Sequence, residues 1–338
     1  MSGPAFWDAV EGREAAKLTR TLLSPLAWLY ASAGTARHRR AQPESVAAPL
    51  ICIGNVTMGG AGKTPVARAV LAVLRARGVA AHALSRGYRG RLKGPVQVDP
   101  AAHSVHDVGD EPLLLAQDGS AWIARDRVAG ARAAVAAGAQ AIVMDDGFQN
   151  PSLRKDLSIL VIDAARPYGN LHVFPAGPLR EPVAAGLARA DAVVLMLPSL
   201  DYAPDMRSLR LEGFEGPVLT AHLAPLGFPP PGPLVAFAGI GRPEKFFDTL
   251  RTAGADIVNE AHFPDHHFYS GADLRDLVRL AERHRAALIT TEKDHVRLPE
   301  NMRRQVSAFP VTARFADPVS LEALVTRAID AHETRGRE

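Results

Sequence analysis

A glycine-rich segment that ends in Gly62-Lys63-Thr64 holds the residues whose types and spacing point most directly to chemistry. The segment begins at Gly54, directly after the apolar run Leu50–Ile53, and a helical stretch starts at Pro65. A strand, a glycine-rich loop and a helix in this order are typical of a P-loop, in which backbone N–H groups and a helix N-terminus surround phosphate oxygens. Lys63 would then reach the β- and γ-phosphates of a nucleotide, and the Thr64 hydroxyl would bind Mg²⁺.

One position of this loop departs from the usual P-loop pattern. Thr57 stands where the first glycine is normally found, and we expect Gly59 and Gly60 to supply the flexibility instead. A glycine-rich turn with a chance Gly-Lys-Thr is the alternative, but the flanking strand and helix disfavour it. The residues predicted to contact the nucleotide are Thr57, Met58, Gly59, Gly60, Ala61, Gly62, Lys63 and Thr64.

Two carboxylates follow another apolar run. Asp145 and Asp146 come directly after Ala141–Met144, which has the composition of a buried strand. An acid at the end of a strand is a weak signal alone, but P-loop proteins hold Mg²⁺ with such a residue, directly or through water. Together with the upstream loop, the pattern predicts a magnesium site formed by Thr64, Asp145 and Asp146.

Further candidates for chemistry are an aspartate and a histidine cluster. Asp110 could accept a proton from a substrate hydroxyl, but the acids and Pro112 around it also suit an ordinary helix start, which the local sequence favours. His262, His266 and His267 could orient a catalytic aspartate, bind a metal or lie in a surface loop without chemistry. Metal binding finds no support from a cysteine or from a second acidic or histidine cluster, as a closed zinc site would need.

Two further segments bear on the ligand. The loop Ser85–Lys93 contains three arginines and could grip a phosphate or carboxylate, although solvated loop charges are the plainer alternative. The segment Thr291–Asp294 superficially resembles the guanine-reading motif of GTPases, but Lys293 adjoins Asp294 with no residue between them. This difference favours ATP over GTP.

Alternating apolar and helical segments would position these residues. Strands that alternate with helices predict a parallel sheet that helices cover on both faces. The expected helices include 66–77 and 125–137. The strand-like runs are Leu50–Ile53, Val79–Leu84, Ala141–Met144, Leu157–Ile162, Ala192–Leu197 and Val218–His222.

The chain is expected to divide into three parts. Residues 1–48 would form an N-terminal helical segment, 49–230 the P-loop domain, and 231–338 a smaller C-terminal α/β domain. The proline-rich segment 228–233 would act as a hinge between the last two parts. In the C-terminal part we expect strands at 234–238, 287–290 and 309–311 and helices at 244–253 and 321–332.

The N-terminal segment has the features of an amphipathic helix. Leu18, Leu22, Leu26 and Leu29 recur at helical spacing, and the basic cluster 37–40 follows them. An apolar face with flanking basic residues suits a helix that lies on a membrane, but a helix packed on the domain would show the same period. The apolar stretch is too short to span a bilayer.

Composition narrows the function classes. The chain has 338 residues, is 47% hydrophobic and carries a formal net charge of +3. A mildly basic chain without a dense basic stripe does not indicate nucleic-acid binding. The single Cys52 lies inside an apolar run, fits a reducing compartment and is assigned no chemistry.

Taken in order, these motifs resemble those of the tetraacyldisaccharide 4′-kinase family, the lipid A 4′-kinases of Gram-negative bacteria. Asp-Asp-Gly-Phe-Gln and the stretch 175–182 are far more specific than a P-loop, and the matches span most of the chain. The matching stretches are Gly54–Pro65, Ser85–Gly90, Gly109–Pro112, Asp145–Gln149, Phe174–Pro182, Asp265–Tyr269 and Thr290–Leu298.

The resemblance implies an ATP- and Mg²⁺-dependent kinase that phosphorylates the 4′-hydroxyl of a tetraacyl glucosamine disaccharide 1-phosphate. It also implies a peripheral location at the cytoplasmic face of the inner membrane, and it implies no particular protein partner. Asp110 would be the catalytic base, paired with His266 or His267, of which His266 is favoured. Lys63 and Arg180 would stabilise the transferring phosphate, and Arg86 would face the acceptor.

Two rival functions follow from the residues alone. A P-loop ATPase or GTPase acting as a switch or metallochaperone would hydrolyse nucleotide without an acceptor and would not depend on Asp110. A non-catalytic membrane-binding module would bind ATP and transfer phosphate to no lipid.

Overall fold

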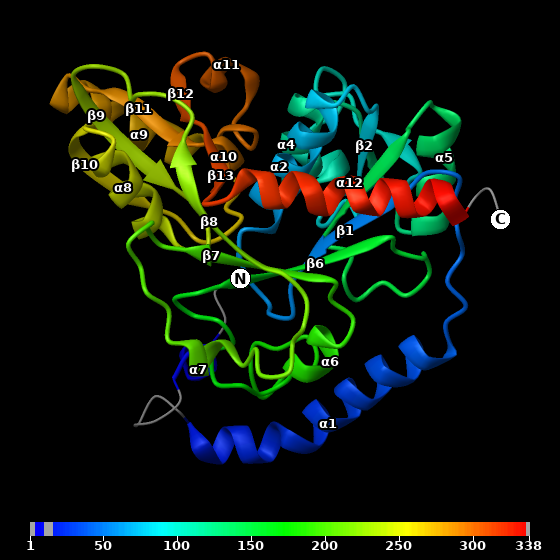
Figure 1. Ribbon diagram of the computed structural model, residues 1–338. Coiled ribbons are helices and arrows are strands. Elements are labelled where there is room, and N and C mark those ends of the chain that lie inside the picture. The colour runs from blue at the N-terminus through cyan, green and yellow to red at the C-terminus, as the bar shows by residue number, and fades with distance from the viewer. Residues whose placement is uncertain (1–3, 10–15, 336–338) are drawn as a thin grey trace.

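The computed structural model describes residues 4–9 and 16–335 of the chain (Figure 1). Two sheets form two lobes, one with nine strands and one with four. The strands of the large sheet are β1 (Leu50–Gly54), β2 (Ala81–Ser85), β3 (Val96–Gln97), β4 (Ala121–Ile123), β5 (Ala141–Asp145), β6 (Leu157–Asp163), β7 (Ala192–Leu197), β8 (Val218–Pro225) and β13 (Val311–Phe315).

The small sheet forms the core of the second lobe. Its strands are β9 (Pro233–Ala238), β10 (Asp256–His262), β11 (Ala287–Thr291) and β12 (Val306–Phe309), all parallel in the order β10-β9-β11-β12. The helices of this lobe are α8 (Pro243–Thr252), α9 (Gly271–His284), α10 (Glu292–His295) and α11 (Glu300–Arg303).

The remaining helices precede or flank the large sheet. They are η1 (Ala5–Trp7), α1 (Lys17–Arg40), α2 (Lys63–Ala76), α3 (Val105–Val108), α4 (Asp110–Asp118), α5 (Arg127–Ala136), α6 (Val183–Leu187), α7 (Met206–Leu209) and α12 (Pro318–Arg335). No helix in the described part of the chain is both long and apolar enough to cross a membrane.

The large sheet confirms the predicted fold class. Its order is β13-β8-β7-β6-β1-β5-β2-β4-β3, and only the edge strands β3 and β13 run antiparallel to their neighbours. Alternation along β1 sends Ile51 and Ile53 into the core beneath α2 and α12, and Leu50 and Cys52 into the core beneath α5. Helices thus cover both faces, as a parallel sheet requires.

The strand order brings the predicted site residues together. β1 lies between β5 and β6, and Ile53 is in register with Asp145. The loop after β1 and the acids after β5 therefore emerge side by side at the carboxyl edge of the sheet, where parallel α/β sheets bind ligands.

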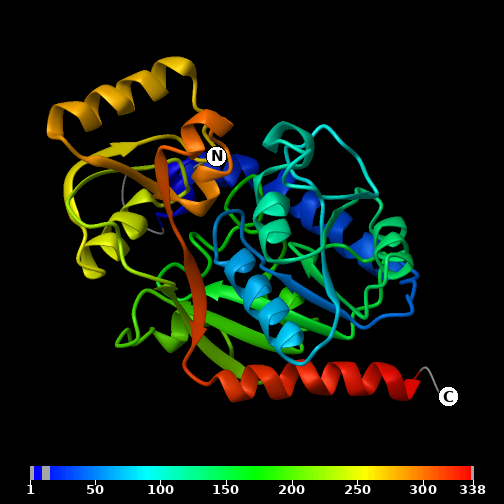
Figure 2. The same cartoon turned by 90° about the horizontal axis from the view of Figure 1, so that it is seen from above.

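The C-terminal end of the chain corrects one prediction. The run expected as one strand at 309–311 is the junction of two strands, with β12 in the small sheet and β13 beside β8 in the large one. Pro310 separates them because proline has no N–H for a sheet ladder. Residues from Val311 onward therefore join the large sheet, not a C-terminal unit, and α12 packs on α2 along the edge of the molecule (Figure 2). The rest of the expected division stays a prediction.

The second lobe is thus an insertion between β8 and β13, joined by two chain segments. These segments lie together, since the Leu226 N–H donates to the Pro310 carbonyl oxygen at 3.0 Å. A paired connection of this kind permits a hinge movement of the lobe.

Candidate active site

The P-loop turns from β1 into α2 with Gly62 at the helix N-cap. Gly62 has φ 89°, and a Cβ there would lie 3.0 Å from the Met196 side chain, so only glycine fits without strain. Gly59 also has a positive φ, of 132°. Thr57 instead forms an isolated antiparallel bridge with Leu179, and its hydroxyl accepts a hydrogen bond from the Asn55 amide at 3.0 Å. Thr57 is not among the residues with a positive φ, so position 57 does not need glycine.

Lys63 and Arg180 flank one carboxylate. Lys63 Nζ lies 3.6 Å from Asp146 Oδ1, and Arg180 Nη1 donates to the same oxygen at 2.7 Å. Burial alone would favour the neutral acid, but Lys63 and then Arg180 outweigh it and hold the pKa of Asp146 at about 2. Two cations from separate segments, 63 and 180, are thus fixed around one ionised group.

Thr64 and Asp145 have the features of a magnesium site. The Thr64 hydroxyl donates to Asp145 Oδ2 at 2.8 Å, while the buried Asp145 Oδ1 has no hydrogen-bond partner among the described residues. Burial, Glu111 and Asp146 raise the pKa of Asp145 to about 7, because this carboxylate lacks sufficient positive charge nearby. A hydroxyl and a carboxylate beside phosphates suit Mg²⁺, which takes few protein ligands. The donors present therefore fit the ion.

The second lobe meets Asp110 at the N-terminus of α4. His266 Nδ1 lies 2.9 Å from Asp110 Oδ2, and Arg297 Nε donates to the same oxygen at 3.0 Å. His267 instead lies against Asp273, with its Nε2 3.0 Å from Oδ2 of that residue. Burial opposes ionisation of Asp110, but His266, Lys293 and Arg297 together hold its pKa well below the usual range.

Sequence reasoning assigned no role to two cations of this cluster. Lys293 Nζ donates to Glu111 Oε1 at 3.1 Å and lies 3.9 Å from Asp110 Oδ2, while Arg297 is almost completely buried. Both follow β11, the last predicted strand before them. Ligands bind at the carboxyl ends of parallel strands, and Lys293 and Arg297 belong to a charged segment that follows such a strand. This position was the sequence signal that could have identified the two residues.

The loop after β2 places a second basic group near the site. Burial and then Arg86 lower the pKa of Arg127 to about 10, and Arg127 Nε is buried without a partner among the described residues. Arg89, farther along the same loop, donates to the His266 carbonyl oxygen at 3.3 Å. The loop that includes Arg86 therefore lies beside the meeting point of the lobes.

The helix α1 reaches the same region from outside. Arg37 Nη2 donates to the Gln149 carbonyl oxygen at 2.6 Å, and the Tyr30 ring packs edge-on against Phe174 at 5.5 Å. A hollow of about 530 Å³ separates α1 from the segment at Pro182, with Trp28 on its helix side. Pro182, which lines the hollow, follows Arg180 by two positions in the sequence.

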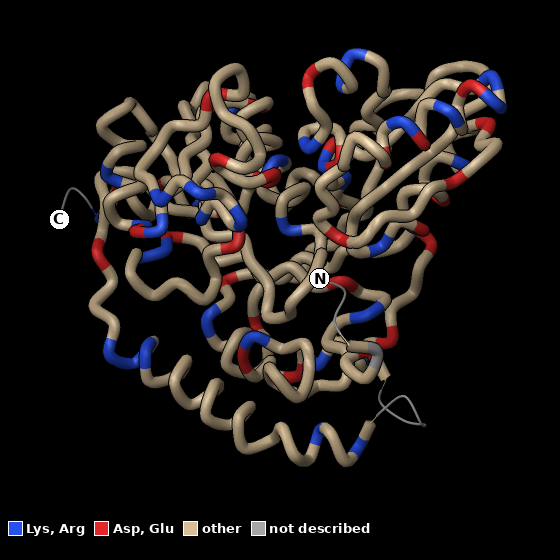
Figure 3. The backbone as a smooth tube through the Cα atoms, turned by 180° about the vertical axis from the view of Figure 1, so that it is seen from behind, with Lys and Arg blue, Asp and Glu red and all other residues tan. Residues whose placement is uncertain are grey.

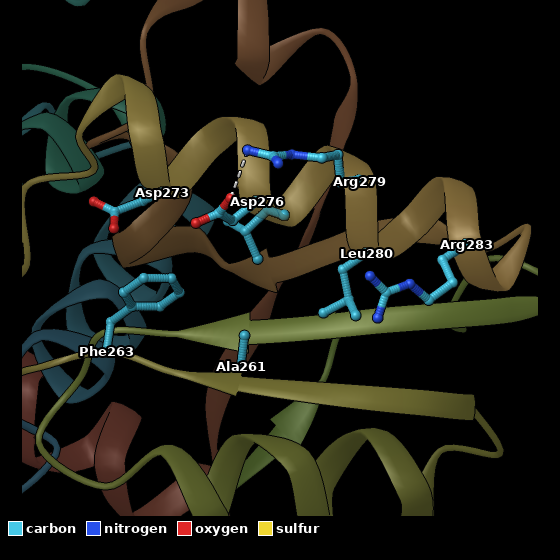
Figure 4. Close-up of a pocket in the computed structure, with 8 residues that line it drawn as sticks. Ala261, Phe263, Asp273, Asp276, Arg279, Leu280 and Arg283 are labelled. Carbon is cyan, nitrogen blue, oxygen red and sulfur yellow. Dashed lines mark hydrogen bonds and ion pairs between the residues drawn. The ribbon is translucent and has the colours of Figure 1, made fainter.

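A different groove lies on the second lobe, and one of its lining residues, Asp273, contacts His267. It runs between α9 and β10, has a volume of about 380 Å³ and contains none of the predicted site residues (Figure 4). Two of its charged groups pair with each other, since Arg279 donates to Asp276 at 2.9 Å. We assign it no function.

A P-loop at the carboxyl edge of a parallel sheet, with a carboxylate beside its threonine, defines a P-loop nucleotide-binding protein. An aspartate clamped from the second lobe, distinct from the residues around Asp146, is the additional group that phosphate transfer to a hydroxyl requires. The geometry thus indicates a phosphotransferase.

Comparisons with known proteins identify the family. The sequence model of the tetraacyldisaccharide-1-P 4′-kinase (LpxK) family matches residues 19–330. The tetraacyldisaccharide 4′-kinase of Maricaulis maris is 52% identical, with 100% of this chain and 99% of the relative covered. That of Caulobacter vibrioides is 54% identical over 96% of this chain and 98% of the relative.

A solved structure agrees with these relatives. The crystal structure of LpxK from Aquifex aeolicus in complex with ATP superposes with a TM-score of 0.74 at 25% identity, covering 92% of this chain and 99% of that one. The chain belongs to the tetraacyldisaccharide 4′-kinase family, and it is a kinase.

Proposed function

We propose that this kinase transfers the γ-phosphate of ATP, with Mg²⁺, to the 4′-hydroxyl of a tetraacyl disaccharide 1-phosphate at a membrane surface. The observation that carries the proposal is the convergence of two lobes on one site. The first lobe contains Lys63, Thr64 and Asp145. Asp110 also belongs to the first lobe, and His266 from the second lobe contacts it. Neither a nucleotide switch nor a metallochaperone needs such a clamped carboxylate.

Each residue has one role in the proposed reaction. The acceptor oxygen forms a bond to the γ-phosphorus, the bond from that phosphorus to the β-bridging oxygen breaks, and ADP leaves. Asp110 orients the acceptor hydroxyl and takes its proton, and His266 holds Asp110. Lys63 and Arg180 stabilise the negative charge on the transferring group.

Thr64 and Asp145, with Asp146 nearby, would hold Mg²⁺. The ion would neutralise phosphate charge and fix its geometry. The unpartnered Asp145 Oδ1 and the Thr64 hydroxyl supply the oxygen ligands, and Lys63 and Arg180 keep Asp146 ionised beside them.

The hollow beside α1 supports a membrane-bound acceptor. α1 carries five Lys or Arg residues and no acid, and residues 21–36 of the helix are uncharged (Figure 3). An acceptor with acyl chains in the bilayer could approach along the hollow toward Arg180, while Arg86 faces its 1-phosphate. In this proposal the enzyme binds peripherally to the membrane face where ATP is present.

The test follows labelled phosphate into lipid. γ-Labelled ATP, Mg²⁺ and a tetraacyl disaccharide 1-phosphate are incubated in detergent with the wild type, Asp110→Asn and the matched control Asp107→Asn, a change at a neighbouring helix cap. We expect label in the lipid with the wild type and Asp107→Asn, a loss of about 10²–10⁴-fold in kcat with Asp110→Asn, and no transfer with chelator. Release of free phosphate without labelled lipid would instead favour the switch.

A further inference from the structure

Arg297 directs all of its donor nitrogens at fixed partners around Asp110. Its side chain is 1% exposed. Nε donates to Asp110 Oδ2 at 3.0 Å, and Nη2 donates to the same oxygen. Nη1 donates to the Gly239 carbonyl oxygen at 2.7 Å and to Asp294 Oδ1 at 2.9 Å. One edge of the guanidinium therefore belongs to the second lobe and the other edge contacts the proposed base.

The partner that anchors Arg297 is itself fixed. Asp294 is completely buried and accepts hydrogen bonds from the Tyr269 hydroxyl at 2.8 Å and the Thr291 hydroxyl at 2.7 Å. A side chain whose supports are locked in this way holds its own target within a narrow geometry. The second lobe thus presents Arg297 as a rigid donor.

Simple attachment of the lobes does not require this arrangement. Arg68 joins the lobes through Glu292 at 3.0 Å, and Arg242 joins them through Asp163 at 2.6 Å, both away from Asp110. A buried ion pair adds little net stability because desolvation of both charges offsets their attraction. The placement of the most buried of these arginines on Asp110 therefore needs a functional reason.

We propose that Arg297 is a positioning residue that, together with His266, fixes Oδ2 of Asp110 so that Oδ1 faces the acceptor hydroxyl. Among the described residues Oδ1 takes one hydrogen bond, from the Glu111 backbone N–H at 3.0 Å, and a carboxylate oxygen has a second lone pair. The base is then complete only when the second lobe is in contact with the first. This inference rests on the proposed function, in which Asp110 is the base.

The charge around Asp110 suits this role. The titratable and charged groups that face it are His266, Lys293 and Arg297 from the second lobe and Glu111 from its own helix. They keep the carboxylate ionised, and a loose transition state for phosphoryl transfer needs an oriented hydroxyl more than a strong base.

The experiment compares Arg297→Gln with the matched control Arg68→Gln, which also removes a lobe-joining arginine but leaves Asp110 untouched. We expect Arg297→Gln to lower kcat about 100-fold with KM for ATP little changed, and to move the acid limb of the pH profile of kcat to higher pH. Arg68→Gln should change kcat less than about threefold. Equal effects of the two variants on kcat would overturn the proposal.

A conservative variant keeps the test decisive if Arg297→Gln fails to fold. Arg297→Lys retains a cation but not the two-nitrogen contact, so it should fold, keep KM for ATP and lose less than about tenfold in kcat. A Lys variant that raises KM and leaves kcat and its pH profile unchanged would also overturn the proposal, since it would assign Arg297 to lobe attachment.

A parallel Asp110→Asn measurement separates this inference from the proposed function. If Asp110→Asn retains normal kcat, the base assignment fails and the inference fails with it. If Asp110→Asn is inactive and Arg297→Gln matches Arg68→Gln, the base assignment stands and the positioning role alone is wrong.

Discussion

At the residue scale, two adjacent carboxylates of the site differ in pKa because different charges surround them. Asp146 has Lys63 and Arg180 within contact and a pKa of about 2, whereas the adjacent Asp145 has a pKa raised to about 7 by burial, Glu111 and Asp146. The cations are thus already balanced by Asp146, and Asp145 is the group that gains most from a divalent ion. Asp146 therefore pairs with the cations, and Asp145 is the better candidate to bind the metal.

Lys63 gives a direct test of the P-loop. Lys63→Ala removes a cation from Asp146 and from the transferring phosphate, so kcat should fall at least about 10²-fold. The fold should persist, because among the described residues Lys63 Nζ makes one long hydrogen bond, of 3.4 Å, to the Gly59 carbonyl oxygen, and Arg180 still pairs with Asp146 when Lys63 is removed. Steady-state kinetics and thermal unfolding measure the two effects. Normal turnover by a folded Lys63→Ala protein would contradict the assignment.

At the element scale, the turn from β1 depends on a close approach of two segments. A Cβ on Gly54 would lie 2.3 Å from the Phe148 Cβ, whereas a Cβ on Gly60 would meet nothing within 4 Å. Phe148 belongs to the Asp-Asp-Gly-Phe-Gln stretch, so this contact sets the spacing between the P-loop strand and the acids. The two glycines of one loop thus have different reasons to be glycine.

These two positions form a matched pair of variants. Gly54→Ala should destabilise the protein by about 1–3 kcal/mol, because Phe148 must move or the strand must shift. Gly60→Ala has open space and a negative φ, so its free energy of unfolding should stay within about 0.5 kcal/mol of the wild type. Urea unfolding compares them, and equal stability of the two variants would contradict the packing argument.

The helix α1 exposes its apolar face. Leu18, Leu22, Leu26 and Leu29 are 55–75% exposed, and Ala27 is the buried residue of the helix. A soluble surface rarely leaves such a stripe uncovered. The sequence left a membrane-lying and a domain-packed helix equally open; the exposed leucines favour the membrane, while Arg37 and Tyr30 still tie the helix to the domain.

Two charges placed on this stripe should weaken membrane binding. In the double variant Leu22→Glu/Leu26→Glu, we expect a loss of about 2 kcal/mol in the free energy of transfer to the membrane. The partition coefficient on anionic vesicles should therefore be roughly 30-fold lower. The control Thr21→Glu/Ser24→Glu adds the same charge outside the stripe and should bind vesicles more strongly than the double leucine variant. Co-sedimentation measures both, and equal binding by the two variants would exclude the leucine face as the contact.

Elements formed by local pattern were predictable, and those formed by long-range pairing were not. The predicted run Ala192–Leu197 is β7 residue for residue, and Leu50–Ile53 is β1 to within one position. β10 was not among the predicted strands, because it is polar, half-exposed and without clean alternation. The division of the run 309–311 at Pro310 depends on which sheet the residues on each side of the proline join. Periodicity carries no information about that choice.

The same limit applies to the site. The P-loop and Asp145 are contiguous with their strands, so sequence was sufficient to predict them. The pairing of Asp110 with a histidine came from family resemblance. The contact of Arg297 with Asp110 spans 187 positions and exists only because the lobes meet, so no local pattern could reveal it.

At the scale of the whole molecule, charged contacts hold the inserted lobe against the P-loop lobe. Asp163, at the end of β6, is buried and accepts hydrogen bonds from Arg242 at 2.6 Å and Lys245 at 3.1 Å, both from the second lobe. With the paired connection at Leu226 and Pro310, we expect these contacts to set the balance between joined and separated lobes. Because Asp110 receives its partners from the second lobe, that balance should control activity.

Weakening this contact should therefore act on the whole catalytic cycle. Asp163→Asn removes the negative charge that two cations face, and a loss of about 1 kcal/mol would lower the population of joined lobes and raise KM for ATP about fivefold. The exposed pair Asp248–Arg251 lies within one lobe, so Asp248→Asn is the control and should leave KM unchanged. Small-angle scattering should show a larger radius of gyration for Asp163→Asn alone. If both variants kept wild-type KM and dimensions, the contact at Asp163 would not govern the lobes, and the paired connection alone would hold them together.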